Sequence, residues 1–152
     1  MPKKPIEVPL RVRAMRYLAR REHSRAELRA KLLPQVQEHD DIEAVLDELE
    51  KRNFLSDARA AEMLVGARRG RFGTQRIAHE LREKGIAENL IDAAIPHLKE
   101  TEFDAARDVW QKKFGAFPKD RKEKAKQVRF LQSRGFQMEA IIKLLKNIGE
   151  ND

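Results

Sequence analysis

The chain has 152 residues, of which 38% are charged and 6% aromatic, and it carries a net charge of +7 with a pI near 9.8. It has no cysteine, which excludes disulfides and thiolate metal ligands and fits a reducing, cytoplasmic location. No apolar run comes near the length of a membrane-spanning helix, about 18 residues, and no signal-peptide core follows the start, so we expect no membrane association.

Residues 10–54 are predicted to form three helices. Apolar residues recur there at helical spacing, and no run alternates apolar and polar residues as a strand would. Ser24 and Glu27 have the spacing of a capping box, which predicts the start of the second helix, and Pro34 predicts its end. A similar pattern at residues 40–43 predicts the start of the third helix.

Residues 55–100 form the second predicted unit. Its first helix is followed by a basic turn between Gly70 and Gly73, which we expect to be flexible. The second helix is expected to end at Gly85, because a glycine directly after a helix adopts the left-handed conformation readily. The third helix is expected over residues 87–99.

Residues 101–149 form the third predicted unit. Thr101 is the expected start of its first helix. Hinges between the units are predicted at residues 53–57 and 99–102. The second helix is expected to stop at Gly135, and the last to span residues 138–147.

The three units repeat with an offset of about 50 residues, which is the pattern of a repeat protein. Five inward positions recur 49 residues on and again 50 residues later, with only Gln127 polar: Leu28, Leu32, Ile42, Leu46 and Leu49, then Ile77, Leu81, Ile91, Ile95 and Leu98, then Gln127, Leu131, Ile141, Leu145 and Ile148. Each unit resembles a helix-turn-helix. The prediction is an all-α fold of three tandem three-helix repeats in an elongated, curved array, preceded by a flexible lead at residues 1–9.

No group of residues has the spacing of an active site. The serines lack a neighbouring base, and Gly70–Thr74 lacks the spacing of a phosphate-binding loop. Trp110 and the phenylalanines lie at helical spacing and are expected in the core. The carboxylates of residues 40–48 are expected to be helix caps and solvated surface groups. We therefore predict no enzymatic activity, no metal and no cofactor. None of the four histidines has metal-ligand spacing, and we expect each at the surface or at a cap: His23, His39, His79 and His97.

Positive charge is distributed unevenly along the chain. Residues 1–35 carry 10 Lys and Arg against 3 Asp and Glu, whereas residues 36–60 carry 3 against 8. Basic residues recur at comparable places in successive units, which predicts weak, salt-sensitive and non-specific binding to the phosphates of single- and double-stranded DNA. The candidate contact residues are Arg20, Arg25, Arg29, Lys31, Arg68, Arg69, Arg71, Arg76, Arg82, Lys84, Lys112, Lys113, Lys122, Lys124, Lys126, Arg129 and Arg134.

Four segments together resemble a known family. They are Ser24-x-x-Glu27-Leu28-x-x-Lys31-Leu32, Phe54-Leu55-Ser56-Asp57, Arg68-x-Gly70-x-x-Gly73-x-x-Arg76-Ile77-x-x-Glu80-Leu81-x-x-Lys84-Gly85-Ile86 and Lys124-x-Lys126-x-x-Arg129-Phe130-Leu131-x-x-Arg134-Gly135-Phe136. In this order, over residues 10–148, they resemble the RecX regulatory proteins, bacterial modulators of the RecA recombinase. Ser56 stands where that family more often has Asp.

The resemblance implies a non-enzymatic, all-helical protein that binds the RecA–DNA filament. There it is expected to impede filament growth and strand exchange, and to lower the ATPase and coprotease activities of RecA. A basic array of several weak contacts fits this partner, because linked contacts reinforce one another. The acidic block at residues 38–50 is a hypothetical contact for a basic patch of the recombinase.

Two other functions fit the same sequence. A stand-alone helix-turn-helix DNA-binding regulator would prefer a particular duplex site and would usually dimerise. The sequence shows no dimerisation helix, so we expect a monomer. An adaptor with incidental charge would not bind DNA at any salt concentration.

Overall fold

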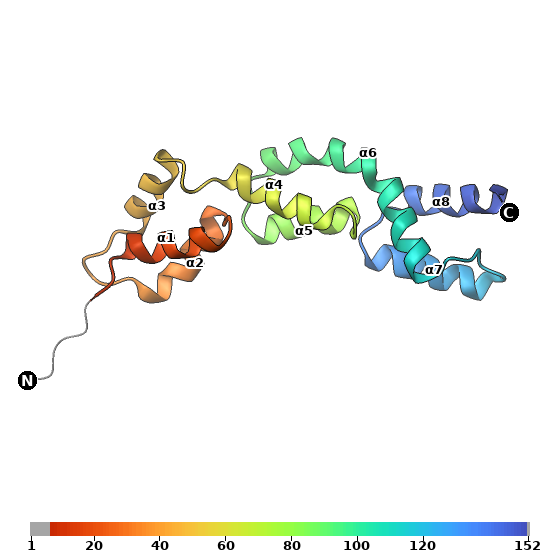
Figure 1. Cartoon of the computed structure of the whole chain (residues 1–152), viewed down its shortest axis with the longest axis horizontal. Helices are drawn as coiled ribbons and strands as arrows, with labels where there is room; N and C mark the ends of the chain where they lie inside the picture. Colours follow the sequence, from red (N-terminus) through yellow and green to blue (C-terminus); the bar gives the residue numbers. More distant parts are fainter. Residues whose placement is uncertain (1–6, 152) are drawn as a thin grey trace, which may run out of the picture. The chain divides into compact units, whose positions relative to one another are not determined.

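The computed structural model describes residues 7–151, in which every regular element is a helix and no strand occurs (Figure 1). This confirms the prediction of an all-α fold. The elements are α1 (Leu10–Arg20), α2 (Arg25–Leu32), a 3₁₀ turn η1 (Leu33–Gln35), α3 (Ile42–Lys51), α4 (Asp57–Arg68), α5 (Thr74–Glu83), α6 (Glu88–Lys113), α7 (Arg121–Ser133) and α8 (Met138–Asn151).

The described residues fall into two compact units. Unit 1 comprises the described residues up to Ala61 together with Lys84–Ile86, and unit 2 comprises Glu62–Glu83 and the described residues from Ala87 onward. The predicted boundaries at residues 54/55 and 100/101 are a finer division, which stays a prediction.

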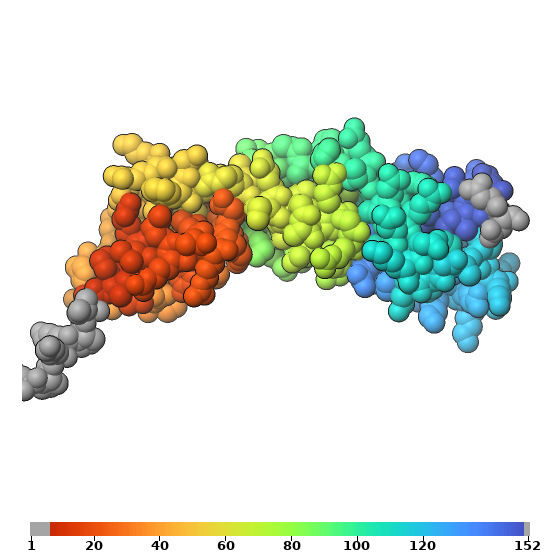
Figure 2. Space-filling view, in the orientation of Figure 1, coloured from red at the N-terminus to blue at the C-terminus, as the bar shows by residue number. Residues whose placement is uncertain are grey.

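The core of unit 1 consists of leucines from three helices. Leu28 and Leu32 of α2 and Leu46 and Leu49 of α3 are fully buried, and Ala14 of α1 packs in the same cluster. In the space-filling view, the atoms of α1, in red, and those of α2 and α3, in orange to yellow, form the visible surface of this unit (Figure 2). A small core of this kind explains how a chain with so few aromatic residues folds.

The predicted helix starts of unit 1 are confirmed by side-chain caps. The backbone N–H of Glu27 donates to Ser24 Oγ at 3.0 Å, and the backbone N–H of Ser24 donates to Glu27 Oε1 at 3.2 Å, which completes the capping box. Asp41 caps α3 by accepting from the N–H of Ala44 at 3.1 Å. Helix α2 ends at Leu32, just before Pro34, as predicted.

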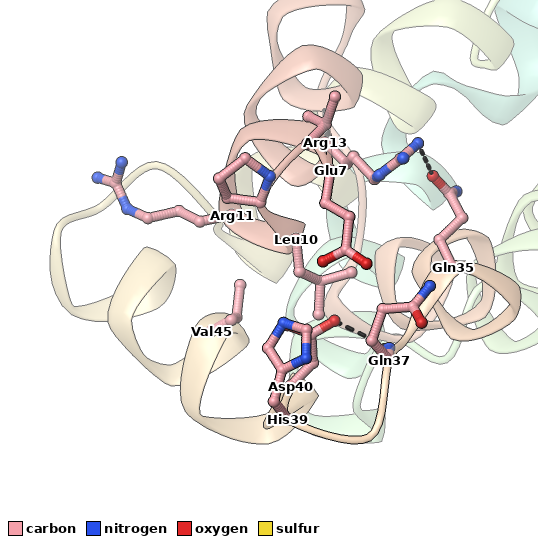
Figure 3. Close-up of a pocket in the computed structure, with 11 residues that line it drawn as sticks. Glu7, Leu10, Arg11, Arg13, Gln35, Gln37, His39, Asp40 and Val45 are labelled. Carbon is pink, nitrogen blue, oxygen red and sulfur yellow. Dashed lines mark hydrogen bonds and ion pairs between the residues drawn. The ribbon is translucent and has the colours of Figure 1, made fainter. Parts of the chain in front are cut away.

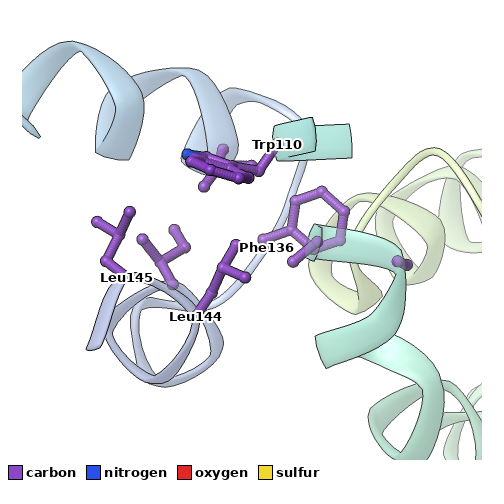
Figure 4. Packing of buried hydrophobic residues seen from close by; sticks show 8 residues of the cluster. Trp110, Phe136, Leu144 and Leu145 are labelled. Atoms are coloured by element: carbon purple, nitrogen blue, oxygen red, sulfur yellow. The ribbon is translucent and has the colours of Figure 1, made fainter. Parts of the chain in front are cut away.

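The core of unit 2 is built around Trp110. Its indole packs with Phe136, Leu144 and Leu145 (Figure 4). The indole Nε1–H donates to Gln127 Oε1 at 2.8 Å. The one polar residue in the repeated inward pattern is therefore the hydrogen-bond acceptor that a buried tryptophan requires.

The repeated inward positions are confirmed. Every residue at the five positions is buried or half-buried in all three repeats. The two glycines predicted to end helices also do so, with φ of +74° at Gly85 and +87° at Gly135. After α7, the N–H of Phe136 donates to the carbonyl of Leu131 and the N–H of Gly135 to that of Gln132, the bonds of a Schellman motif.

The hinge predicted at residues 99–102 is wrong, because α6 runs unbroken through it. The hydroxyl of Thr101 does not cap a new helix but donates back to the carbonyl of Leu98 at 3.3 Å, as threonines inside helices do. The next residue, Glu102, is buried and accepts from the backbone N–H of Thr74 at 3.0 Å. Its carboxylate therefore caps the start of α5 and does not mark a break in α6.

Two glycine-containing turns of unit 2 touch backbone to backbone. The N–H of Gly73, before α5, donates to the carbonyl of Arg134 at 2.8 Å. A Cβ on Gly73 would lie 2.2 Å from the carbonyl oxygen of Gly135, and a Cβ on Gly135 would lie 2.3 Å from Cβ of Arg76. The turn predicted to be flexible is therefore held between α4 and the end of α7.

Unit 1 contains an equivalent contact, 49 to 50 residues earlier in the chain. The hydroxyl of Ser24, before α2, donates to the carbonyl of Lys84 at 2.5 Å. A Cβ on Gly85 would lie 2.5 Å from Cβ of Ala26. In both units, therefore, a glycine turn at the end of another helix packs against the start of the second helix.

Replacing Gly73 with Ala should lower the free energy of unfolding by about 1–3 kcal/mol, because the added methyl collides with backbone that cannot move aside. Urea denaturation followed by circular dichroism measures this change. Gly70→Ala is the matched control, since a Cβ there meets no atom within 4 Å. Equal stabilities of the two variants would contradict the turn contact.

Candidate functional site

In unit 1 the acidic block binds the basic residues of α2. Arg25 forms ion pairs with Glu43 at 2.7 Å, Asp47 at 2.6 Å and Glu50 at 3.1 Å, and Arg29 pairs with Glu43 at 2.6 Å. The hydrogen bond to Glu43 raises the pKa of Arg25, and those from Arg29 and Arg25 lower the pKa of Glu43. The acidic residues are therefore not a separate patch, and the two arginines are already neutralised.

His23 is buried, which corrects the prediction that it lies at the surface or at a cap. Only 1% of it is exposed, and burial lowers its pKa. Its Nδ1 lies 3.0 Å from the carbonyl of Arg21 and its Nε2 lies 2.7 Å from Nζ of Lys31, contacts that fit a neutral ring with the proton on Nδ1. Lys31 therefore already has a hydrogen-bond partner within unit 1. The other three histidines are exposed as expected: His39, His79 and His97.

Glu27 is the centre of a second ion-pair group in unit 1. Its carboxylate accepts from Arg21 at 2.9 Å and from Lys84 at 3.0 Å. Burial by itself would raise the pKa of Glu27, but the hydrogen bonds from Arg21, the backbone of Ser24 and Lys84 lower it to about 2. Lys84 therefore has its counter-charge within unit 1.

Three more candidate residues, all in unit 2, have partners as well. The hydrogen bond with Glu88 raises the pKa of Arg82, because it favours the charged guanidinium. The contacts are Arg68 to Glu80 at 3.2 Å, Arg82 to Glu88 at 2.6 Å and Arg69 to the hydroxyl of Thr101 at 3.4 Å.

A stripe of unpaired cations lies on α7. Lys122, Lys126 and Arg129 are exposed and have no partner in the described part of the chain. Their spacing of four and then three residues places them on one side of the helix. Lys124 lies instead along a groove between α7 and α8. The remaining candidates without a partner among the described residues are Arg20, Arg71 and Lys112.

A row of alternating cations and aromatic rings is the feature that sequence reasoning missed. Arg76 lies 4.2 Å and Arg134 5.5 Å from the ring centre of Phe72. Arg134 also lies 5.1 Å from the ring of Phe130, and Lys113 lies 5.3 Å from that ring. The phenylalanines were expected to pack only in the core, so their contacts with cations were not predicted. A signal was present, since each ring is followed four residues later in the sequence by one of these arginines.

A cavity of about 360 Å³ lies in unit 1 beside the start of α1 (Figure 3). Polar groups on its wall bind one another: Arg13 donates to Gln35 at 2.8 Å, and the N–H of Gln37 donates to Asp40 at 2.9 Å. Within residues 7–151 no three His, Asp or Glu side chains gather as metal ligands would. Among the described helices, none combines the length and apolarity needed to span a membrane.

Comparison with known proteins gives one consistent result. Family models described as the first, second and third three-helix domains of RecX match residues 11–49, 56–95 and 100–145. The regulatory protein RecX of Herminiimonas arsenicoxydans is 46% identical over 147 residues, which cover 97% of either chain. The RecX of Herbaspirillum seropedicae is 48% identical over 141 residues, covering 93% of this chain and 90% of that one.

A solved structure agrees with the fold. The crystal structure of RecX from Lactobacillus salivarius matches with a TM-score of 0.79 over 92% of this chain and 94% of its own, at 22% sequence identity. At that identity the similarity supports the fold alone.

Replacing Glu27 with Gln should destabilise the protein at neutral pH by about 1–3 kcal/mol, because Lys84 and Arg21 lose their charged partner. The folded-state pKa of Glu27 is about 2, below its ordinary value of 4.5. Its ionised form therefore stabilises the fold above pH 4.5, and this contribution is lost as the pH falls towards 2.

Thermal melting of both proteins between pH 2 and 7 tests this expectation. The difference between wild type and Glu27→Gln should shrink below pH 4.5. Glu62→Gln is the control, since Glu62 is exposed and has no partner in the described part of the chain. A difference that stays constant over the pH range would show that the ion pairs of Glu27 do not stabilise the fold.

Proposed function

Because the chain belongs to the RecX family of regulatory proteins, we propose that it is a negative modulator of the RecA recombinase. It binds the RecA–DNA filament as a monomer and limits filament extension, strand exchange, ATPase and coprotease activity in DNA repair and the SOS response. It acts by binding, without a cofactor and without catalysing a reaction.

The observation that supports DNA contact is the distribution of free positive charge. Arg25 and Arg29 of α2 are neutralised within unit 1, whereas Lys122, Lys126 and Arg129 on α7 are exposed and unpaired within residues 7–150. Free cations on one side of a helix displace counterions from a phosphate backbone, and this release drives association. We therefore place the DNA contact on unit 2.

The chemistry of the α7 stripe favours phosphate contact over base readout. Lysines contact phosphates as point charges, and such contacts carry no sequence information. The amide of Gln127 on the same helix is buried against Trp110 and cannot reach a base. A stand-alone regulator that reads a duplex site therefore has less support than a filament regulator. It would be favoured if the protein bound one duplex sequence preferentially at moderate salt.

The protein should inhibit the single-strand-dependent ATPase of RecA when added well below one copy per RecA protomer. Linked weak contacts with several protomers and with DNA give a long-lived complex, so that few copies suffice. A steady-state ATPase assay measures this, with polylysine of equal charge as the control. No inhibition, or inhibition only at saturating amounts and matched by polylysine, would contradict the proposal.

Replacing Lys122, Lys126 and Arg129 together with Ala should weaken this inhibition, because the stripe loses its three cations, while the melting temperature stays within a few degrees of wild type. The matched control replaces Lys99, Lys143 and Lys146, three exposed lysines on α6 and α8, and removes the same charge. Equal losses in the two variants would show that net charge, rather than the α7 stripe, determines inhibition.

A further inference from the structure

Two arginines in unit 2 share one aromatic ring and lack a counter-charge. Arg76 and Arg134 lie 4.2 and 5.5 Å from the ring centre of Phe72. The side chain of Arg76 has one hydrogen bond, to the carbonyl of Ser133 at 3.3 Å, and neither arginine meets a carboxylate among residues 7–150. Because no carboxylate compensates these two positive charges, the arrangement favours the binding of an anion.

The backbone contact between the two glycine turns creates this pairing. Gly73 donates to the carbonyl of Arg134, and Gly135 lies so near Arg76 that a Cβ would approach its Cβ to 2.3 Å. Phe72 directly precedes Gly73 and presents its ring to both guanidinium groups. The two cations are thus positioned by the fold, and little conformational entropy remains to be lost when they bind a ligand.

The equivalent contact in unit 1 shows that the pairing of two cations is not needed for packing. In unit 1 the residue that faces the glycine turn, as Arg76 does in unit 2, is Ala26, and the position of Arg134 corresponds to Lys84, which forms an ion pair of 3.0 Å with Glu27. The position of Phe72 corresponds to His23, which is buried and neutral. The glycine turn of unit 1 therefore carries one cation with a carboxylate beside it, whereas the turn of unit 2 brings two cations to one ring without a carboxylate among the described residues.

We propose that Arg76, Arg134 and Phe72 form a clamp for the phosphodiester backbone of DNA. The planar guanidinium groups match the geometry of phosphate oxygens, and both lie against the ring of Phe72. The row continues through Phe130 to Lys113, so that neighbouring phosphates of one strand meet further cations. The clamp rests on the proposed function, since it identifies where in unit 2 the DNA is held.

The test measures binding of a fluorescein-labelled oligothymidine to the full chain without RecA, by fluorescence anisotropy over a range of salt concentrations. Arg134→Gln and Arg76→Gln should each weaken binding about tenfold at low salt. Each should also reduce the slope of log K against log salt by about 0.7, the value for one phosphate contact on a single strand.

Phe72→Leu separates positioning from charge. It leaves the net charge unchanged and removes only the ring that holds the two guanidinium groups. Binding should weaken about two- to fivefold, the magnitude of an exposed cation–π contact. Arg16→Gln is the matched control, since Arg16 is exposed on α1 and has no partner in the described segment, and the variant loses the same charge. Circular dichroism checks that each variant is folded.

The clamp is supported if DNA affinity falls more in Arg76→Gln, Arg134→Gln and Phe72→Leu than in Arg16→Gln. Equal affinities and slopes for Arg134→Gln and Arg16→Gln overturn it, as does a wild-type chain that fails to bind the oligonucleotide at low salt. The ATPase of RecA, measured in parallel with the wild-type chain, keeps the two proposals apart. Inhibition without an effect of these substitutions removes the clamp alone, whereas absence of inhibition removes the filament regulator.

Discussion

The contact between a glycine turn and the start of a second helix is the constraint on which the rest of this structure depends. It occurs in unit 1 between Ser24 and the Lys84–Gly85 turn, and in unit 2 between Gly73 and the Arg134–Gly135 turn. In both units a Cβ on the glycine that ends the other helix would collide with the second helix, at Ala26 in unit 1 and at Arg76 in unit 2. Close approach fixes which side chains become neighbours, and those side chains then determine the local electrostatics.

This shared geometry has opposite electrostatic consequences in the two units. Around Glu27, unit 1 satisfies its cations internally, and the low pKa of that carboxyl reflects their hydrogen bonds. Around Phe72, unit 2 leaves two guanidinium groups without a carboxylate within the described residues. An internal ion pair contributes to stability, whereas an uncompensated pair of cations offers binding energy to an anion. This difference is why we propose that unit 2 binds DNA.

Several errors of sequence reasoning share a physical origin. Threonine often caps a helix, but the hydroxyl of Thr101 donates to the carbonyl of Leu98 within α6. The carboxylate of Glu102 accepts a hydrogen bond from the start of α5. His23 is flanked by charged residues, yet it is buried because Lys31 and a backbone carbonyl satisfy both ring nitrogens. For Glu102 the deciding partner lies 28 positions away in the sequence, and for His23 it is a lysine 8 positions away, so a cap or charge pattern over three or four residues did not specify either outcome.

The sequence by itself determined the helices, most of their caps and the inward positions of the repeat, because helical periodicity and capping act over three or four residues. It also identified the family. Only the tertiary structure decided which cations are free. Arg29 is neutralised by a residue 14 positions away and Lys84 by one 57 positions away, while the α7 stripe meets no carboxylate in the part of the chain described. Charge neutralisation depends on distance in space, which composition and spacing along the chain do not specify.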